Sequence, residues 1–231
     1  MNNYLIITGG SYGIGLGIAE YFLEQQYKVI NLSRTPCLLS GVINFEVDLA
    51  ESGFEKNLLD LLPLLAEASK ITLVHNACRL GIIDTVENVE PTILREMLEV
   101  NIVSPVILNK LIIPKMKEGS SIIYIGSTLS TRATAGALSY VTAKHAMVGL
   151  MKMTCQDLWN TGVHTACICP GFTDTPGAKR YQTIPNQEDK WKSFQTRLIQ
   201  PEEVATTEYF VANNPVVNGT LLMTDLGQKE G

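Results

Sequence analysis

Three polar residues in the second half of the chain could together carry out acid–base chemistry: Ser127, Tyr140 and Lys144. Tyr140 and Lys144 stand four positions apart, so a helix would place both on one face and bring the ammonium near the phenol. A free phenol has a pKa of roughly 10, which a nearby cation and a place in the first helical turn would both lower. We therefore predict that Tyr140 exchanges a proton with a carbonyl or alcohol oxygen, which Ser127 holds by a hydrogen bond.

The spacing of these residues is specific. The sequence contains one Tyr-x-x-x-Lys pair, and Ser127 precedes Tyr140 by thirteen positions, just after an apolar run that ends at Ile125. The alternative interpretation is a surface Tyr–Lys pair beside an unrelated loop serine.

A glycine-rich run near the start of the chain could bind a phosphate. The run from Thr8 to Gly15 reads TGGSYGIG, follows an apolar strand candidate and opens a helical pattern. Glycine allows positive φ and lets the backbone approach a pyrophosphate, whose charge a helix N-terminus stabilises. This context predicts a dinucleotide-binding loop, and an ordinary glycine-rich turn is the alternative.

The end of the next strand candidate indicates which dinucleotide is preferred. An acidic residue there would accept hydrogen bonds from the adenosine ribose and favour NAD(H). Ser33 occupies this place without charge, and Arg34 follows it with a guanidinium suited to a 2′-phosphate. The sequence therefore favours NADP(H), with NAD(H) as the second choice. An arginine that merely faces solvent is the alternative.

Short apolar runs alternate with helical patterns along the chain. Continuous apolar runs are typical of parallel strands that are covered on both faces. Strands are expected at 4–8, 28–32, 42–47, 71–75, 121–125, 163–169 and 220–223. Helices are expected at 14–26, 54–68, 91–116, 138–161 and 202–213. The alternation predicts a single α/β domain over residues 1–231, with a doubly wound, Rossmann-type sheet of seven parallel strands flanked by helices.

One crossover in this scheme is short. Residues 34–41 join the second and third strands, whereas a parallel crossover usually takes about a dozen residues and contains a helix. We expect a loop or a single turn there, which leaves that face of the sheet thinly covered.

The composition excludes several classes of protein. The chain has 231 residues, 45% of them hydrophobic, and 18 Lys and Arg against 23 Asp and Glu give a net charge of −5. This apolar content excludes a disordered chain, and the lack of basic runs argues against nucleic-acid binding. Five cysteines without a Cys-x-x-Cys pair are expected to be buried thiols of a cytoplasmic protein. No stretch is expected to span a membrane, and the isolated residues His75, His145 and His164 are expected in the core rather than on a metal.

The motifs, their order and their spacing resemble the short-chain dehydrogenase/reductase family, and the resemblance covers nearly the whole chain. It implies an oxidoreductase that transfers hydride between a nicotinamide cofactor and a small-molecule carbonyl or alcohol. Lys144 would also hold the nicotinamide ribose hydroxyls, and Asn101 would carry a water toward Lys144. By the same resemblance, the cofactor would contact Gly9, Ser11, Tyr12, Gly13, Ile14, Gly15, Ser33, Arg34, Asp48, Leu49, Asn76, Ala77, Tyr140, Lys144, Pro170, Gly171, Phe172 and Thr173.

The resemblance also implies a substrate lid and a homo-oligomer. Residues 176–198 fall where these enzymes keep a lid, and a plain surface helix is the alternative. The helices expected at 91–116 and 138–161 would form a homodimer or homotetramer, which agrees with a charged fraction of 18%. One position departs from the family pattern, because Cys78 stands where a glycine is usual and would crowd the nicotinamide ribose.

Backbone chemistry gives Asn101 separate support. Pro105, four residues on, has no N–H, so the Asn101 carbonyl lacks its usual helical partner and could hold a water. A tolerated proline kink is the alternative.

Other classes of function fit the residues less well. A non-catalytic NADP(H)-binding sensor or scaffold would have no use for an intact set of Ser127, Tyr140 and Lys144. A methyltransferase would need an acid where Ser33 stands, and a nucleotide-sugar epimerase would need a second domain. The residues select no particular substrate.

Overall fold

The computed structural model describes residues 2–79, 82–182 and 197–227. Within these residues, seven strands form one parallel sheet in the order β3-β2-β1-β4-β5-β6-β7. The chain winds outward from β1 to β3 and then crosses to β4 on the other side, which confirms the doubly wound, Rossmann-type sheet. The strands are β1 Asn3–Thr8, β2 Lys28–Ser33, β3 Ile43–Glu46, β4 Lys70–His75, β5 Ser121–Ile125, β6 His164–Pro170 and β7 Thr220–Thr224.

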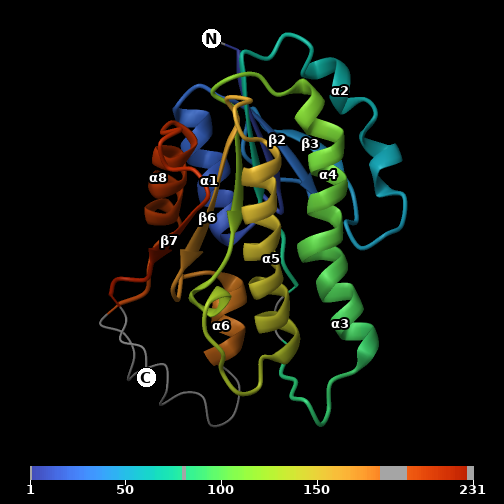
Figure 1. The fold of residues 1–231 in the computed structure, drawn as a ribbon, viewed down its shortest axis with the longest axis vertical. Coiled ribbons are helices and arrows are strands. Elements are labelled where there is room, and N and C mark those ends of the chain that lie inside the picture. Colours follow the sequence, from blue (N-terminus) through green and yellow to red (C-terminus); the bar gives the residue numbers. More distant parts are fainter. Residues whose placement is uncertain (1, 80–81, 183–196, 228–231) are drawn as a thin grey trace.

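Helices cover both faces of the sheet (Figure 1). On one face, α1 (Gly13–Glu24) packs against α8 (Pro201–Ala212). Over the other face lie α4 (Ser104–Ile112) and α5 (Leu138–Asp157). The described residues also form α2 Leu61–Leu64, α3 Pro91–Leu98, α6 Pro176–Gln182 and 3₁₀ helices at Phe54–Leu58, Ile113–Lys115 and Thr128–Ser130.

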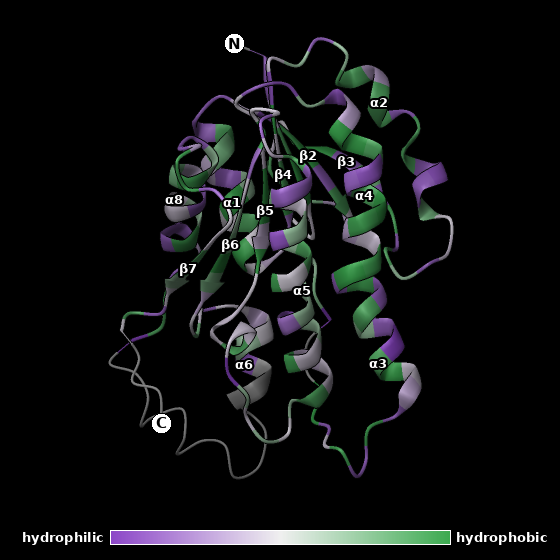
Figure 2. Cartoon of the chain, in the orientation of Figure 1, coloured by the Kyte–Doolittle hydropathy of each residue, from purple (hydrophilic) through white to green (hydrophobic). Residues whose placement is uncertain are grey.

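Successive residues of β1 point to opposite faces and enter two separate cores. Tyr4 and Ile6 join the core beneath α4 and α5, whereas Leu5 and Ile7 join the core beneath α1 and α8. Figure 2 shows the central strands largely in the hydrophobic colour. Because both faces are covered, strands of this kind need the continuous apolar runs from which the sequence predicted them.

The helix expected at 54–68 does not form as one element. The structure has a 3₁₀ helix at Phe54–Leu58 and a single α-helical turn, α2. Pro63 has no N–H to donate, and the N–H groups of Leu62 and Leu65 bond to carbonyls three residues back. The proline therefore favours separate tight turns over a continuous helix.

A long helical run begins at Pro91, passes through α3, a π-helical segment at Glu99–Val103 and α4, and ends at Lys115. It confirms the helix expected at 91–116 but is irregular at its centre. Leu108 and Ile112 anchor the run in the core of the sheet. By length and composition alone this run could cross a membrane, with a mean hydropathy of 1.4, but core helices of soluble proteins pass the same test.

The crossover at 34–41, which the structure describes in full, contains no helix, as predicted. The side chain of Asn44 on β3 fixes the conformation of this crossover. Its Oδ1 accepts the Cys37 N–H at 2.7 Å, and its Nδ2 donates to the Cys37 carbonyl at 3.0 Å. β3 forms the edge of the sheet and is mostly exposed. Side-chain hydrogen bonds, rather than a helix, therefore hold this crossover against the edge strand.

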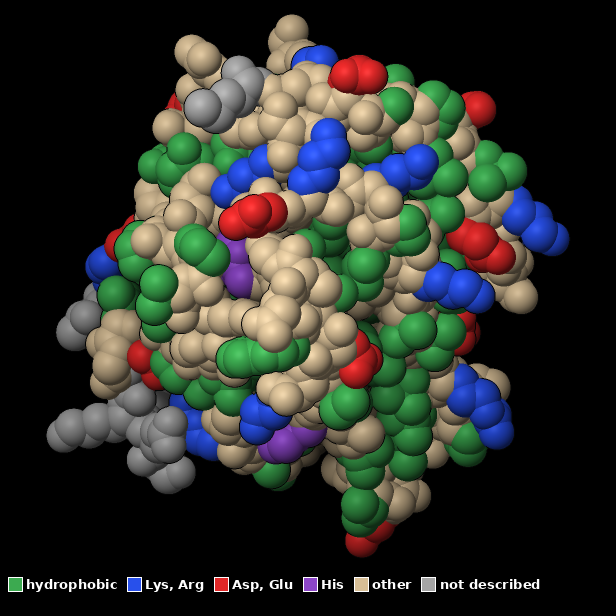
Figure 3. All heavy atoms as spheres, turned by 45° about the horizontal axis from the view of Figure 1, so that its top comes forward, with side chains coloured by type: hydrophobic (Ala, Val, Ile, Leu, Met, Phe, Trp, Pro, Cys, Tyr) green, Lys and Arg blue, Asp and Glu red, His purple; other side chains and the backbone are tan. Residues whose placement is uncertain are grey.

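Four of the five cysteines are buried, as expected, and Cys78 is half-buried. Cys167 and Cys169 point to the same face of β6, with their Sγ atoms 3.8 Å apart. On the face that Figure 3 draws, basic and acidic side chains are interspersed rather than gathered into one patch.

Candidate active site

The glycine loop joins β1 to α1 at the carboxyl end of the sheet. Gly9 and Gly13 have φ of +68° and +56°, in the left-handed region that favours glycine. A Cβ on Gly15 would lie 2.2 Å from the Gly9 carbonyl oxygen, so a side chain there is excluded. Tyr12 is 63% exposed and gives α1 no side-chain cap, while Ile14 packs on the core. An uncapped helix start beside a close-packed backbone is what a phosphate cradle requires.

Thr8 and Asn76 attach the glycine loop to the end of β4. Thr8 Oγ1 accepts the N–H groups of Asn76 and Ala77, both at 3.0 Å. Asn76 Nδ2 in turn donates to the Thr8 and Gly9 carbonyls, each at 3.0 Å. Asn76 and Ala77, both predicted cofactor residues, therefore lie against the loop at the point where the strand order reverses.

Asn31 on β2 is a residue of this site that the motifs do not reveal. Its Oδ1 accepts the Gly10 N–H at 2.8 Å, and its Nδ2 donates to Ser11 Oγ at 3.1 Å and Asn44 Oδ1 at 2.9 Å. Ser11 Oγ also donates to the Thr35 carbonyl. The sequence does contain one signal for Asn31, an amide side chain inside an otherwise apolar strand. A buried amide must find hydrogen-bond partners, so it indicates a structural contact there.

The residues predicted for the adenosine lie together where β2 and β3 end. The Arg34 side chain is 77% exposed, and one of its terminal nitrogens, Nη1, is 3.8 Å from Asp48 Oδ2. The Ser33 carbonyl accepts the Val47 N–H at 3.1 Å, which keeps the two strand ends adjacent. Leu49 is buried in the core beside them.

Ser127 follows β5 and begins the 3₁₀ helix at Thr128–Ser130. Its Oγ accepts the Leu129 N–H at 3.1 Å, and its own N–H donates to Ser130 Oγ at 3.0 Å. A hydroxyl whose oxygen already accepts a bond keeps its proton for donation. This geometry suits Ser127 to donate to a substrate oxygen.

Tyr140 stands in the first turn of α5, and Lys144 follows one turn later. Lys144 is 2% exposed, and its Nζ donates to the Ile125 carbonyl at 2.7 Å. The same Nζ lies 5.7 Å from the centre of the Tyr140 ring. A hydrogen bond joins the side chains of Ser127 and Tyr140. The structure thus brings together the three residues from which the sequence predicted acid–base chemistry.

The pKa of Tyr140 is raised, so the expectation that it would be lowered is wrong. Burial of the phenol is the largest cause and the nearby Cys78 thiol adds to it, whereas the hydrogen bond with Ser127 opposes the rise. Tyr140 as a whole is half-buried. The Lys144 ammonium, 5.7 Å from the centre of the ring, does not outweigh this burial. The phenol is therefore protonated at neutral pH.

Asn101 is fully buried in the π-helical segment Glu99–Val103. The Ser104 N–H bonds to the Glu99 carbonyl five residues back, and such wide turns are frequent at functional sites. Asn101 Nδ2 donates to the Met97 carbonyl at 2.9 Å. Within the described parts of the chain, Asn101 Oδ1 is buried and has no hydrogen-bond partner, a need that a bound water could meet.

The residues predicted for the nicotinamide end follow β6, which ends at Pro170. The Gly171 N–H donates to the Thr224 carbonyl at 3.1 Å, and Thr173 Oγ1 donates to the Gly171 carbonyl at 3.1 Å. Phe172 is 38% exposed. These bonds hold the segment at the same edge of the sheet as the glycine loop.

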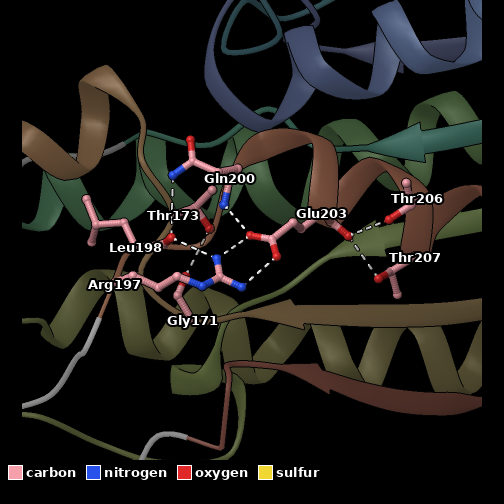
Figure 4. A network of polar contacts seen from close by, with 8 residues as sticks. All are labelled: Gly171, Thr173, Arg197, Leu198, Gln200, Glu203, Thr206 and Thr207. Atoms are coloured by element: carbon pink, nitrogen blue, oxygen red, sulfur yellow. Dashed lines mark hydrogen bonds and ion pairs between the residues drawn. The ribbon is translucent and has the colours of Figure 1, made fainter.

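The expected lid at 176–198 is described in part. It begins with α6, while residues 183–196 lie outside the described residues. Thr173 pairs with Ile199 in a parallel bridge, which ties the two flanks of the segment together. Figure 4 shows the adjoining network, in which Arg197 donates to both Glu203 oxygens at 2.6 and 2.7 Å. Chiefly through this Arg197 pairing, the pKa of Glu203 is lowered to about 2.

His75 is a buried structural residue, as predicted. Its Nε2 lies 2.8 Å from Asn109 Oδ1, and burial lowers its pKa to about 4 against the opposing hydrogen bond. His164 is also buried, with Nε2 2.9 Å from the Val211 carbonyl. The expectation that His145 lies in the core is wrong, because it follows the inward-facing Lys144 on α5 and is exposed. Among the residues that the structure describes, no group of three His, Cys, Asp or Glu could hold a metal ion.

A glycine loop at the switch point of a doubly wound sheet, with a Ser–Tyr–Lys group at the same edge, defines a dinucleotide-binding oxidoreductase. The family model described as short chain dehydrogenase matches residues 3–185. The chain belongs to the short-chain dehydrogenase/reductase family and is an NAD(P)-dependent oxidoreductase.

Individual relatives match nearly the full chain. The 3-oxoacyl-[acyl-carrier-protein] reductase of Chlamydia muridarum is 28% identical over 243 aligned residues, which cover 98% of this chain and 97% of the relative. A short chain dehydrogenase family protein from Francisella tularensis has a TM-score of 0.87 and 25% identity over 98% of both chains. Aldohexose dehydrogenase from Thermoplasma acidophilum has a TM-score of 0.85 and 28% identity over 97% of this chain and 93% of its own.

Proposed function

We propose that the protein interconverts a carbonyl compound and the corresponding alcohol, with NADPH preferred over NADH and Tyr140 as the general acid and base. The convergence of Ser127, Tyr140 and Lys144 beside the glycine loop carries this proposal. The names of two relatives refer to an oxoacyl group and an aldohexose, and both contain a carbonyl or alcohol carbon. Their difference leaves the particular substrate open.

The residues of the site fit a nicotinamide dinucleotide, since the glycine cradle excludes a Cβ at Gly15 and α1 begins without a cap. When bound, the nicotinamide supplies or accepts a hydride. In this proposal, the glycine loop at residues 9–15 holds the pyrophosphate. The adenosine is held by Ser33, Arg34, Asp48 and Leu49. The nicotinamide riboside is held by Asn76, Ala77, Lys144 and residues 170–173.

The proton chemistry falls to the chain's own side chains. Ser127 donates its hydroxyl proton to the substrate oxygen in a hydrogen bond, and Tyr140 transfers its phenol proton to that oxygen. The raised pKa of Tyr140 keeps this proton on the phenol at neutral pH, so the residue is ready to act as the acid. The buried ammonium of Lys144 then stabilises the phenolate. The unpartnered Oδ1 of Asn101 supports a water that returns a proton toward Lys144.

Arg34 supports the preference for NADPH. Its guanidinium is exposed at the end of β2, where an acidic residue would repel a phosphate. Its contact with Asp48 is 3.8 Å long and faces solvent, so this pairing is weak. A 2′-phosphate offers the guanidinium two charged acceptors in its place.

The proposal includes a cytoplasmic homodimer or homotetramer of single-domain subunits, with 176–198 as the substrate lid. Val106 on α4 and Met153 on α5 are 46% and 56% exposed, and a second copy packed along these helices would cover them. Neither a nucleic acid nor a membrane is proposed as a partner.

The test is NADPH oxidation with acetoacetyl-coenzyme A, menadione or a steroid ketone, together with NADP⁺ reduction by D-glucose. We expect turnover of at least one compound, faster with the phosphorylated cofactor than with NADH or NAD⁺. If none of these compounds is turned over while NADPH binds tightly, the enzymatic proposal is overturned and a sensor or scaffold is favoured.

A further inference from the structure

α5 carries Tyr140 in its first turn, but the helix has no cap of its own. Its N-cap residue is Ala137, which offers no side-chain acceptor to the first N–H groups of the helix. Asp84, from the loop between β4 and α3, supplies the missing acceptors. The Leu138 N–H donates to the Asp84 carbonyl at 3.2 Å, and the Ser139 N–H donates to the Asp84 carboxylate at 3.1 Å.

Both the main chain and the side chain of Asp84 are engaged at this helix start. The Ser139 hydroxyl also donates to the carboxylate, and the Asp84 N–H donates to the Gly136 carbonyl at 3.2 Å. Asp84 is 4% exposed and Ser139 is fully buried. Gly136 has φ of +81°, and a Cβ there would lie 3.2 Å from Ile83, so glycine permits this close pairing. A buried carboxylate with N–H and O–H donors around it acts as a cap rather than as a surface charge.

We propose that Asp84 is a positioning residue for Tyr140 and acts by capping α5 from a distant loop. The inference rests on the proposed function, because the group it positions is the proton donor of that function. Tyr140 directly follows Ser139, so the bonds that Asp84 makes fix the main chain from which the phenol projects. A catalytic group displaced by about 1 Å can lose roughly 100-fold in rate.

The charge of Asp84 has a second effect on Tyr140. A carboxylate at a helix N-terminus offsets the positive end of the helix dipole, which would otherwise favour the phenolate. Asp84 therefore helps the phenol to keep its proton. The other groups that face the phenol are Cys78 after β4, Ser127 after β5, Cys169 on β6 and Lys144 on α5.

The test compares Asp84→Ala and Asp84→Asn in the full-length protein. Asp157→Asn is the matched control, because it removes an exposed carboxyl at the far end of α5. The readouts are NADPH binding, turnover of NADPH with acetoacetyl-coenzyme A or menadione, and hydrogen exchange of the main-chain amides at 138–141.

The two variants separate hydrogen bonding from charge. Asp84→Ala removes the side-chain acceptors, so kcat should fall about 10- to 100-fold and amide exchange at 138–141 should quicken, with NADPH affinity unchanged. Asp84→Asn can accept from the Ser139 N–H and donate to its hydroxyl, so amide protection should persist. Without the negative charge, the alkaline limb of its pH–rate profile should move to lower pH.

Wild-type turnover and wild-type amide protection in Asp84→Ala would overturn the proposal. If Asp84→Ala does not fold, Asp84→Glu takes its place, because it moves the same charge by one methylene. We expect Asp84→Glu to lower kcat, and wild-type turnover in this variant would also overturn the proposal. If the wild-type protein reduces no compound of the panel, the proposed function fails by itself. Amide exchange then still decides whether Asp84 caps α5, and unchanged exchange in Asp84→Ala overturns the cap.

Discussion

Lys144 and Tyr140 share one face of α5, yet the lysine Nζ bonds to the Ile125 carbonyl at 2.7 Å and lies 5.7 Å from the centre of the tyrosine ring. Burial fixes the ammonium in this position, because a buried charge cannot leave its acceptor without cost. The cation is thus placed to stabilise a phenolate, while loss of solvent around the phenol retains the proton beforehand. The arrangement suits a donor that releases its proton only when a substrate oxygen accepts it.

Replacing Tyr140 by Phe removes the hydroxyl and keeps the ring. We expect turnover to fall by about 10²- to 10⁴-fold, the usual contribution of a positioned proton donor, with NADPH affinity unchanged. Tyr209→Phe on α8, in an aromatic cluster with Phe22, is the control and should turn over normally. Steady-state rates and NADPH fluorescence titration measure both quantities. A Tyr140→Phe enzyme of near wild-type turnover would remove Tyr140 from the chemistry.

The rate of reduction should depend little on pH through the neutral range and fall in the alkaline range. The reason is that the proposed reaction consumes the protonated phenol, whose pKa is raised above 10.0, first by burial and then by the Cys78 thiol. Oxidation needs the phenolate, so its rate should rise over the same alkaline range. Initial rates in both directions across a pH series measure this, and a reduction rate that already falls near neutral pH would contradict it.

Replacing Arg34 by Asp should shift the preference toward NADH. Each charged hydrogen bond to a phosphate contributes about 1.5–3 kcal/mol, so the KM for NADPH should rise by about 10- to 100-fold. The introduced carboxylate would also suit a ribose hydroxyl, which favours NADH. Arg34→Lys retains the charge but not the paired donors, so its preference for NADPH should lie between those of the wild type and Arg34→Asp. An unchanged ratio of NADPH to NADH efficiency would exclude Arg34 from the phosphate site.

The parts of the site that depend on local spacing could be predicted from the sequence. The glycine loop needs a strand before it and a helix after it, and the pair of Tyr140 and Lys144 needs one helical turn. Asn31 and Asp84 could not be placed in the same way, because their partners are distant: Asp84 and Ser139 stand 55 positions apart. Which distant residues meet is decided by the topology of the sheet and not by a local pattern.

Two errors of the sequence predictions have the same kind of cause. The pKa of Tyr140 depends on how deeply the fold buries the phenol, which the i, i+4 spacing does not report. The segment 54–68 has the apolar spacing of a helix, but Pro63 has no N–H to donate. The chain therefore forms separate tight turns there. Apolar patterning predicts which residues are buried more reliably than it predicts the regularity of the backbone that carries them.

Replacing Pro105 by Ala should lower turnover more than stability. Alanine restores an N–H to the helix and is about 3 kcal/mol more favourable there, so the π-helical segment at Glu99–Val103 should become regular and the melting temperature should not fall. The carbonyl and side chain of Asn101 would then lose the geometry proposed to hold a water, and turnover should fall by about tenfold or more. Pro114→Ala at the end of the same run is the control. Unchanged turnover in Pro105→Ala would count against the relay.

His75 should make the free energy of unfolding depend on pH between about 6.5 and 4. Burial lowers the pKa of the native imidazole to about 4, whereas the unfolded histidine titrates at 6.5. Over this range the unfolded state binds the extra proton, so stability falls as the pH falls, by an upper limit of about 3 kcal/mol.

His75→Asn should be less stable at neutral pH, because a smaller side chain leaves space beside Tyr124, but its stability should decline less steeply toward pH 4. His164 also has a pKa lowered by burial, so part of the slope should remain. His145→Asn, which replaces an exposed imidazole on α5, is the matched control. Urea unfolding over a pH series measures all three proteins. Equal slopes in the wild type and His75→Asn would show that burial of this imidazole does not set the acid stability of the fold.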